Sequence, residues 1–270
     1  MRPINVAVVQ MHPQLAEIEE NIIRMSNFIE EICKSEKVDI IIFPELITTG
    51  YECGVRFTEL AQPVPGYTVG LIAQRAAEFN VHLAFGMVAK HKVESILYDA
   101  AVLIGPDGEL IGDYHKVHLK GEERLAFRSG YRYHIFETGF GLLGLLIGWD
   151  LAFPEAARSL ALEGAELICV CANWETPNTE EWHTYVLSRA LENTIFVAAA
   201  NRVGEEYTYS FFGDSMIVGP RGEVYASVDH DLEGYGLARI DLDEVKKYRE
   251  ELQILQCRRP TTYRAIVKKY

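Results

Sequence analysis

The hydrophobic and polar residues of this chain alternate in blocks that predict strands followed by helices. Residues 5–9 and 38–43 are short runs rich in β-branched side chains, which is typical of buried strands. Between them, apolar residues recur at helical spacing through residues 14–37. The run 38–43 is apolar on both faces, as expected for a strand that helices or a second sheet cover on each side. The pattern therefore predicts an α/β fold.

The same periodicities predict the remaining elements. Helices are expected at residues 69–80, 154–163 and 180–193. Strands are expected at residues 82–87, 99–104, 110–114, 133–136, 142–147, 167–171, 194–200, 215–218 and 234–240. Two similar turns, residues 105–109 and 219–223, combine glycine with proline and predict hairpins, the second between the strands at 215–218 and 234–240. Because hairpins add antiparallel pairs, the sheets should be mixed, and the repeated turn indicates two related halves.

Composition narrows the class of protein. The chain has 270 residues, of which 49% are hydrophobic and 24% charged. This suffices for one large core, so residues 1–270 are expected to form a single domain. The formal net charge of -13 argues against nucleic acid or an anionic membrane as a partner. Residues 258–270 are basic and aromatic, and we expect them to form a C-terminal arm that packs on a neighbouring subunit.

Targeting and cysteine patterns favour a cytoplasmic protein. The first residues lack the apolar core of a signal peptide, and no apolar run reaches the roughly 18 residues of a membrane span. The five cysteines are scattered without paired CxxC spacing, which indicates reduced thiols rather than a disulfide framework or a zinc site. Cys169 and Cys171 lie within the strand at 167–171 and are expected in the core.

The strand at 142–147 is the first candidate for a functional site, because a polar turn and then a helix follow it. Ligands bind at the carboxyl ends of parallel strands, and Gly148, Trp149 and Asp150 occupy such an end. Gly148 stands at the point of the turn. A site built here therefore has no reactive atom at its apex.

Two charged residues follow other strands. Glu45 comes directly after the strand at 38–43, where burial raises the pKa of a carboxyl group toward the range of a general base. A solvated glutamate at a strand end is the alternative. Lys116 shares one face of an alternating segment with Tyr114 and His118 and could place a positive charge in a cleft, although most lysines lie on the surface. Glu123, in an irregular segment, is by itself more typical of a solvent-facing residue.

Other candidates are weaker on their own. His115 and His118 could suggest a metal, but no further ligands complete a coordination set, so no metal site is predicted. Trp174 and Trp182 could wall a pocket, with simple aromatic packing as the alternative.

Taken together, these segments resemble the nitrilase superfamily of carbon-nitrogen hydrolases. The resemblance rests on three motifs in order: Phe43-Pro44-Glu45, Tyr114-His115-Lys116-Val117-His118-Leu119, and Gly148-Trp149-Asp150 continuing to Phe153-Pro154-Glu155. Supporting segments include Ala172-Asn173-Trp174 and Gly213-Asp214-Ser215. The likeness extends from residue 6 to about residue 240.

The resemblance implies a four-layer α-β-β-α sandwich with mixed sheets, a homodimer or higher homo-oligomer, and a Glu-Lys-Cys triad that needs no cofactor. By this likeness Glu45 is the general base, Lys116 stabilises the oxyanion and Glu123 is a second glutamate that orients the site. The backbone amide of Trp149 would help to hold the oxyanion, and the stretch that begins at Asn173 and Trp174 would line the substrate pocket. The implied substrate is a small amide or N-carbamoyl compound, which loses ammonia through a thioester.

The chain departs from this family at one decisive position. The nucleophilic cysteine should stand where Gly148 does, and none of the five cysteines occupies a matching place. Either the chain is an engineered inactive variant of an amidase, or it is a natural pseudoenzyme that acts as a binding or scaffold protein. The first explanation is favoured because Glu45, Lys116 and Glu123 are all retained. A nitrile-hydrolysing member of the same family is a further alternative, since nitriles and amides share the triad and are selected by loops such as residues 48–57 and 175–182.

The sequence disfavours the hypothesis that the chain is a nucleotide-binding α/β protein. No glycine-rich phosphate loop follows any predicted strand.

Overall fold

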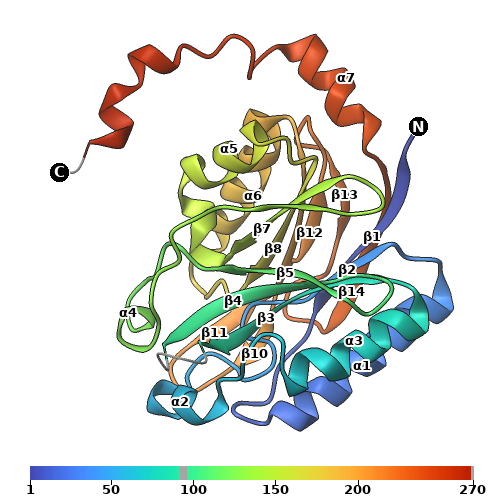
Figure 1. The fold of residues 1–270 in the computed structure, drawn as a ribbon, viewed down its shortest axis with the longest axis vertical. Coiled ribbons are helices and arrows are strands. Elements are labelled where there is room, and N and C mark those ends of the chain that lie inside the picture. The colour runs from blue at the N-terminus through green and yellow to red at the C-terminus, as the bar shows by residue number, and fades with distance from the viewer. Residues whose placement is uncertain (92–95, 269–270) are drawn as a thin grey trace.

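The computed structural model describes residues 1–91 and 96–268, and over these residues two six-stranded sheets pack face to face (Figure 1). The first sheet has the order β14-β1-β2-β3-β4-β5. Its strands are β1 (Pro3–Gln10), β2 (Ile40–Ile42), β3 (His82–Lys90), β4 (Leu97–Ile104), β5 (Leu110–His115) and β14 (Gly234–Asp241). The second sheet has the order β13-β12-β9-β8-β7-β6. Its strands are β6 (Ile135–Glu137), β7 (Leu142–Ile147), β8 (Leu167–Ala172), β9 (Phe196–Asn201), β12 (Met216–Val218) and β13 (Val224–Ser227).

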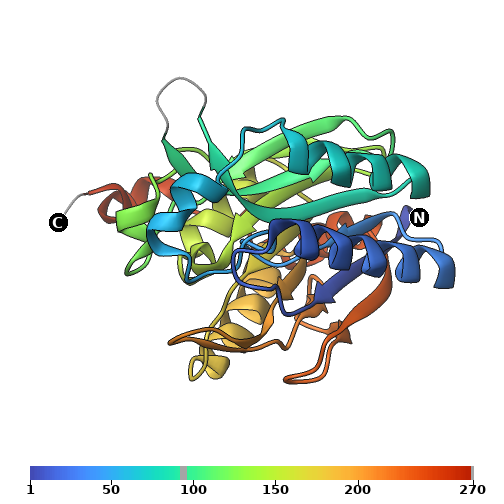
Figure 2. The same cartoon turned by 90° about the horizontal axis from the view of Figure 1, so that it is seen from below.

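Helices cover the outer face of each sheet. Helices α1 (Ile18–Ser35) and α3 (Tyr67–Phe79) lie side by side over the first sheet (Figure 2). Helices α5 (Pro154–Leu162) and α6 (Thr179–Asn193) cover the second sheet (Figure 1). The layers are therefore α-β-β-α, and the predicted sandwich with mixed sheets is confirmed.

Shorter elements complete the chain. They are α2 (Phe57–Leu60), α4 (Glu123–Ala126), α7 (Asp243–Leu252), the two-stranded sheet of β10 (Val203–Glu205) and β11 (Ser210–Phe212), and 3-10 turns at Gly54–Arg56, Gly148–Ala152, Pro260–Thr262 and Arg264–Val267.

The two sheets have the same construction. In each, three parallel strands (β1-β2-β3 and β7-β8-β9) are joined through helices, and an antiparallel hairpin (β4-β5 and β12-β13) extends one edge. The two Gly-Pro turns close these hairpins, with Gly108 at a φ of +80° and Gly222 at +83°. This agrees with the two related halves that the repeated turn indicates.

Two predicted elements are wrong in detail. The second Gly-Pro turn joins β12 to β13, whereas the strand predicted at 234–240 is β14, which pairs with β1 in the other sheet. Strand β13 escaped prediction because it is short and only half-buried, so it lacks a clear apolar pattern. The helix predicted at 14–37 begins only at Ile18, since Ala16 has a positive φ of 63° that no helix accommodates.

The strands are apolar on both faces because each face is covered. In β1, Val6 and Val8 point into the core between the sheets, whereas Ala7 and Val9 pack with the residues under α1 and α3. Each fully buried aliphatic side chain of this kind contributes about 1.5–3 kcal/mol to the free energy of unfolding. The carboxyl ends of these strands are thereby held rigidly enough to carry a site.

Candidate active site

The carboxyl ends of parallel strands from both sheets meet at one place. Glu45 follows β2, whereas Gly148 and Asn173 follow β7 and β8 of the other sheet. Lys116 follows β5, and its backbone N–H donates to the carbonyl of Asp99 in β4 at 2.9 Å. Residues that are far apart in the chain are thus brought together at the edge where α/β sheets bind ligands.

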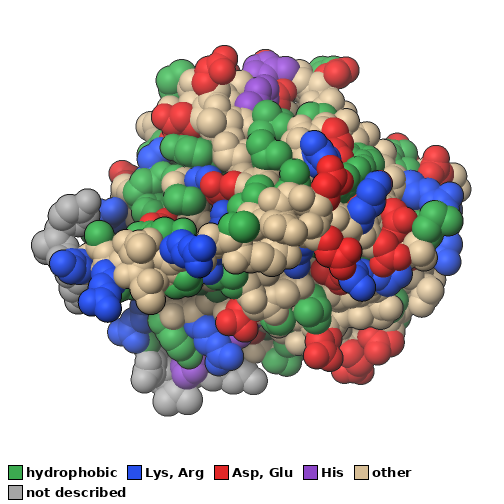
Figure 3. All heavy atoms as spheres, turned by 90° about the horizontal axis from the view of Figure 1, so that it is seen from above, with side chains coloured by type: hydrophobic (Ala, Val, Ile, Leu, Met, Phe, Trp, Pro, Cys, Tyr) green, Lys and Arg blue, Asp and Glu red, His purple; other side chains and the backbone are tan. Residues whose placement is uncertain are grey.

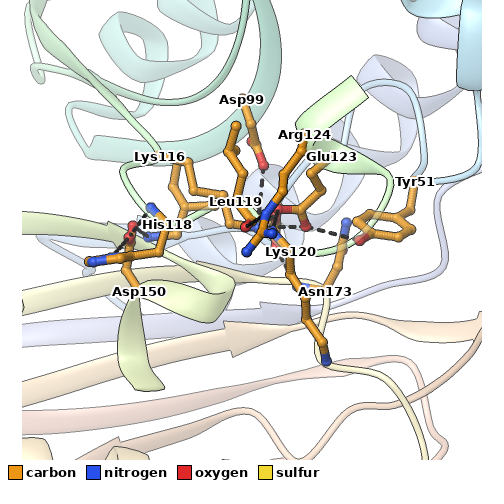
Figure 4. A network of polar contacts seen from close by, with 12 residues as sticks. Tyr51, Asp99, Lys116, His118, Leu119, Lys120, Glu123, Arg124, Asp150 and Asn173 are labelled. Atoms are coloured by element: carbon orange, nitrogen blue, oxygen red, sulfur yellow. Dashed lines mark hydrogen bonds and ion pairs between the residues drawn. The ribbon is translucent and has the colours of Figure 1, made fainter. Parts of the chain in front are cut away.

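Lys116 is the centre of this site. Its Nζ donates to Glu45 Oε1 at 2.6 Å and to Glu123 Oε1 at 2.8 Å, and the three side chains are 2%, 1% and 5% exposed respectively. In Figure 4 the side chains of Lys116, Asp99 and Glu123 point toward one another. The alternatives of a surface lysine and a solvated strand-end glutamate are therefore wrong.

Glu45 is held from two sides. Its second oxygen, Oε2, accepts a hydrogen bond from the backbone N–H of Asn173 at 2.9 Å. The turn that carries Glu45 packs so closely on β3 that a Cβ on Gly86 would lie 2.5 Å from the Glu45 Cα. Burial raises the pKa of Glu45, and although Lys116 opposes this shift, the pKa remains above its ordinary value. A carboxyl group with a raised pKa is suited to taking up and returning protons.

For Lys116, unlike Glu45, the neighbouring charges together have a larger effect on the pKa than burial does. Burial lowers the pKa of its ammonium group, but Glu123, Glu45 and Asp99 outweigh this and hold the pKa well above its ordinary value. Lys116 is therefore a permanent positive charge rather than a base.

Glu123 lies at the start of α4 and is buried, so its interpretation as a solvent-facing residue is wrong. Its Oε1 also accepts from the Tyr51 hydroxyl at 2.9 Å, and its Oε2 accepts from the backbone N–H of Lys120 at 2.9 Å. Burial followed by the negative charge of Glu123 raises the pKa of Tyr51, so its hydroxyl stays a donor. Tyr51 lies in an irregular loop, where periodicity gives no signal.

Gly148 begins the 3-10 turn after β7, at a φ of +39°. A Cβ placed there would lie 2.5 Å from Glu45 Oε2 and 3.4 Å from Lys116 Nζ. Asp150, two residues further along the chain, holds this turn in place. It accepts a hydrogen bond from the Tyr114 hydroxyl at 2.7 Å and one from the backbone N–H of His118 at 3.0 Å. Figure 4 shows His118 and Asp150 as a group beside the Lys116 contacts. Any side chain at position 148 would thus be directed at Glu45 and Lys116.

The remaining predicted residues line the same pocket. Trp149, Asn173 and Trp174 share it with Glu45, Tyr51, Lys116, Lys120, Glu123 and Glu175. Trp174 is 4% exposed and packs against Trp182. It therefore forms part of the pocket wall and also takes part in aromatic packing, the two alternatives considered for it.

Asn173 carries a side-chain amide whose nitrogen and oxygen are both buried. Neither atom has a hydrogen-bond partner among the described residues. An amide in this state can be satisfied by a polar group of a ligand.

A charged pair at the rim of the pocket was not predicted from the sequence. Lys120 Nζ donates to Glu175 Oε1 at 2.6 Å, with the side chains 43% and 21% exposed. Both residues sit in segments without regular periodicity, so no pattern brings them together.

None of the five cysteines, all of which the structure describes, lines the pocket around Lys116. Cys169 and Cys171 are fully buried in β8, and burial raises the pKa of both thiols, which disfavours the reactive thiolate. Over residues 1–91 and 96–268, no group of three or more His, Cys, Asp or Glu side chains is arranged to hold a metal ion. Over the same residues, every helix is too short or too polar to cross a membrane.

The arrangement joins a buried ammonium, a carboxylate with a raised pKa and a backbone turn that directs position 148 at both. Such a set can polarise a carbonyl group and move protons beside it.

Comparison with known proteins gives the family. The carbon-nitrogen hydrolase family model matches residues 5–250. The chain is 40% identical to the probable nitrilase C965.09 of Schizosaccharomyces pombe, over 97% of this chain and 98% of that protein. It is 31% identical to the 2-oxoglutaramate amidase of Bacillus subtilis, over 96% and 98% of the two chains. The crystal structure of Nit3 from Saccharomyces cerevisiae, a member of the nitrilase superfamily, has a TM-score of 0.87 at 25% identity, covering 93% and 94% of the two chains.

The chain therefore belongs to the carbon-nitrogen hydrolase family, the nitrilase superfamily. Its homologues include amidases and nitrilases.

Proposed function

We propose that this site hydrolyses the C–N bond of a small amide or N-carbamoyl compound when cysteine occupies position 148, and that the chain with Gly148 is a variant without its nucleophile. The observation that carries the proposal is the direction of position 148. A Cβ there meets Glu45 Oε2 at 2.5 Å and Lys116 Nζ at 3.4 Å, so a thiol would stand beside both the base and the cation. The contact is with the end of the Glu45 side chain, which must shift to admit the thiol, and the φ of +39° adds backbone strain for any residue with a Cβ.

The proposed reaction begins with attack of the thiol sulfur on the amide carbonyl carbon. The thiol proton passes to Glu45, and the negative charge on the carbonyl oxygen is stabilised by Lys116 and by the backbone N–H of Trp149. When the C–N bond breaks, Glu45 returns the proton to the nitrogen. Ammonia departs, and the acyl group remains on the sulfur as a thioester. Water then attacks the thioester, Glu45 takes its proton, and the sulfur recovers a proton as the carboxylic acid leaves.

The other residues of the site have supporting roles in this proposal. Glu123 fixes the Lys116 ammonium, and the Asn173 amide and the Trp174 ring bound the pocket. No cofactor enters the reaction.

Nitriles are the alternative substrate. Two homologues carry the name nitrilase, from Schizosaccharomyces pombe and Pyrococcus abyssi, whereas others are named 2-oxoglutaramate amidase and N-carbamoylputrescine amidase. All of these reactions start with attack on a carbon bound to nitrogen. The substrate panel must therefore contain amides, N-carbamoyl compounds and nitriles.

The direct test is the Gly148→Cys variant, assayed for ammonia release over that panel. We expect turnover on at least one substrate class, with Gly148→Ala as the matched control that adds a Cβ but no thiol. Loss of a nucleophile that acts together with its base costs on the order of a millionfold in rate, so the two variants should differ clearly. A folded Gly148→Cys protein that is inert on every substrate contradicts the proposal.

Gly148 itself favours a second candidate function, a pseudoenzyme that binds small amides or acts as a scaffold. This candidate requires that the natural gene encodes glycine at position 148 and that the chain binds an amide without a covalent adduct. Calorimetric titration with an unreactive amide, followed by mass spectrometry, measures both features. A cysteine codon in the natural gene would end this candidate.

We further propose that residues 1–270 act as one hydrolase domain in the cytoplasm, assembled as a homodimer or larger homo-oligomer through the arm at 258–270. Residues 269 and 270 lie outside the described part of the chain. In Figure 1 the arm follows α7 and arches over α5. A cavity of about 370 Å³ separates the arm from α5, and it is lined partly by Ile254, Tyr263 and Ile266. Space of this kind beside apolar side chains suits a segment of a second copy.

A further inference from the structure

Asp99 is an acidic residue of the site to which the proposed reaction gives no role. It lies in β4, and its side chain is fully buried. Its Oδ2 is 3.7 Å from Lys116 Nζ (Figure 4), the atom that also donates to Glu45 Oε1 at 2.6 Å, so the carboxyl groups of Asp99 and Glu45 face the same ammonium group. Three carboxyl groups, those of Glu45, Asp99 and Glu123, therefore surround one ammonium group.

The charges in this cluster do not balance if every group is ionised. Three negative charges against the one positive charge of Lys116 would leave an excess of two negative charges among side chains that are at most 5% exposed. Uncompensated charge is strongly disfavoured away from water, and a buried carboxyl group escapes this cost by taking up a proton.

Hydrogen-bond donors identify which carboxyl group holds the proton. Glu45 accepts from Lys116 Nζ and from the backbone N–H of Asn173. Glu123 accepts from Lys116 Nζ, from the Tyr51 hydroxyl and from the backbone N–H of Lys120. Neither oxygen of Asp99 accepts a hydrogen bond from a described residue. Donors stabilise the ionised form, so Asp99 is the group that lacks this stabilisation.

We propose that Asp99 is a neutral carboxylic acid at neutral pH, and that it donates its proton in a hydrogen bond to Glu45. Asp99 is then a positioning residue, which holds the Glu45 carboxylate toward position 148 and keeps it ionised. The role in turnover rests on the proposed function, whereas the protonation state does not.

The surroundings of Asp99 agree with this assignment. The titratable groups that act electrostatically on it are Glu45 from the turn after β2, Lys116 from the end of β5 and Glu123 from α4, and Asp99 in turn acts on the thiol of Cys171 in β8. Burial, followed by the charge of Glu45, raises the pKa of Asp99 well above its ordinary value, and Lys116 is too distant to reverse the shift. A hydrogen bond from Asp99 acts to lower the pKa of Glu45.

Infrared spectroscopy of the chain as it exists tests the protonation state without any turnover. A buried carboxylic acid has a carbonyl stretch at higher frequency than the amide band. We expect this stretch at neutral pH, shifted when aspartate is labelled with ¹³C at its side-chain carboxyl group and absent from Asp99→Asn. Absence of the stretch at neutral pH overturns the proposal. So does a stretch that ignores aspartate labelling and disappears in Glu45→Gln, because the proton would then belong to Glu45.

The pH profile of the Gly148→Cys enzyme tests the positioning role. Asp99→Asn keeps an N–H donor toward Glu45, so the acid limb of kcat/KM should stay in place. Asp99→Leu removes the donor, which should raise the pKa of Glu45 and move the acid limb up by about one pH unit, a tenfold effect on ionisation. If Asp99→Leu lowers the rate but leaves the acid limb unmoved, the residue is merely structural and the positioning role is wrong. If Gly148→Cys is inactive, the proposed function fails, but the infrared result still decides the state of Asp99.

Discussion

Lys116 Nζ lies 2.6 Å from Glu45 Oε1, and the two side chains are only 2% and 1% exposed. An ion pair at this depth is costly to form and more costly to break, since removal of one partner leaves the other charge buried and unpaired. The pair is thus a structural requirement as well as a catalytic candidate.

Replacing Lys116 by Met should lower the free energy of unfolding by about 3–5 kcal/mol. The matched control is Lys120→Met, because Lys120 pairs with Glu175 at the pocket rim and is 43% exposed, so its loss should cost less than about 1 kcal/mol. Urea denaturation of both variants measures the difference. Equal losses would contradict the central place of Lys116.

The deficit of Lys116→Met should depend on pH in a definite direction. The folded-state pKa of Glu45 is raised above its ordinary value of 4.5, and removal of the cation takes away an attraction that opposes the rise. A group with a raised folded-state pKa contributes stability below its unfolded pKa, and this stability is lost as the pH rises through the folded-state value. The deficit should therefore be smallest near pH 4.5 and should grow toward about pH 8. A deficit that shrinks over this range would contradict the assignment.

Gly148→Ala tests how tightly position 148 fits the site. A φ of +39° is unfavourable for a residue with a Cβ, and that Cβ would meet Glu45 Oε2 at 2.5 Å. Together these effects should cost about 1–3 kcal/mol of stability.

Gly70→Ala is the matched control for this substitution. Gly70 lies in α3, where an added Cβ meets no atom within 4 Å, and alanine is favoured there by roughly 1 kcal/mol. Thermal unfolding should therefore show opposite signs for the two substitutions. A stabilised Gly148→Ala would mean that position 148 does not face Glu45.

The sequence predicted the residues of the site that stand directly after buried strands, since an abrupt change from apolar to charged residues marks both Glu45 and position 148. The strand at 142–147 has the predicted bounds. In contrast, Glu123 is buried against Lys116 and Tyr51, and no local pattern encodes these contacts. Asp99 lies on a strand and was not singled out, because periodicity says that a side chain is buried but not which charges it meets.

The arrangement of the strands was also only partly predictable from the sequence. Turn residues marked the positions of both hairpin turns, because glycine at a positive φ is a local requirement, but the second strand of the second hairpin was predicted at 234–240 and is β13 in the structure. The partner of β14 could not be predicted in this way, since its pairing with β1 joins residues more than two hundred positions apart.

Tyr51→Phe should weaken the site without unfolding the protein. The substitution removes the hydroxyl that donates to Glu123 Oε1 at 2.9 Å and leaves a buried carboxylate with one donor fewer, at a cost of about 1–3 kcal/mol. In Gly148→Cys we expect kcat/KM to fall as the Lys116 contact loosens. Tyr131→Phe is the control, because Tyr131 is 90% exposed and its substitution should change stability by less than about 0.5 kcal/mol. Indistinguishable variants would show that Glu123 does not depend on Tyr51.

The C-terminal arm is predicted to hold two copies of the chain together. Tyr263 and Ile266 are 37% and 58% exposed, and the arm carries hydrophobic side chains among basic ones on the face seen in Figure 3. If these apolar groups contact a second copy, then Ile266→Asp in the full-length chain places a charge in that contact and should raise the dimer dissociation constant at least tenfold. Leu232→Asp, at a position with a similar exposure of 57%, should leave association unchanged. Light scattering coupled to size-exclusion chromatography over a dilution series measures both. A dimer equally stable in both variants would place the interface elsewhere, and a monomer in the unsubstituted chain would remove the predicted role of the arm.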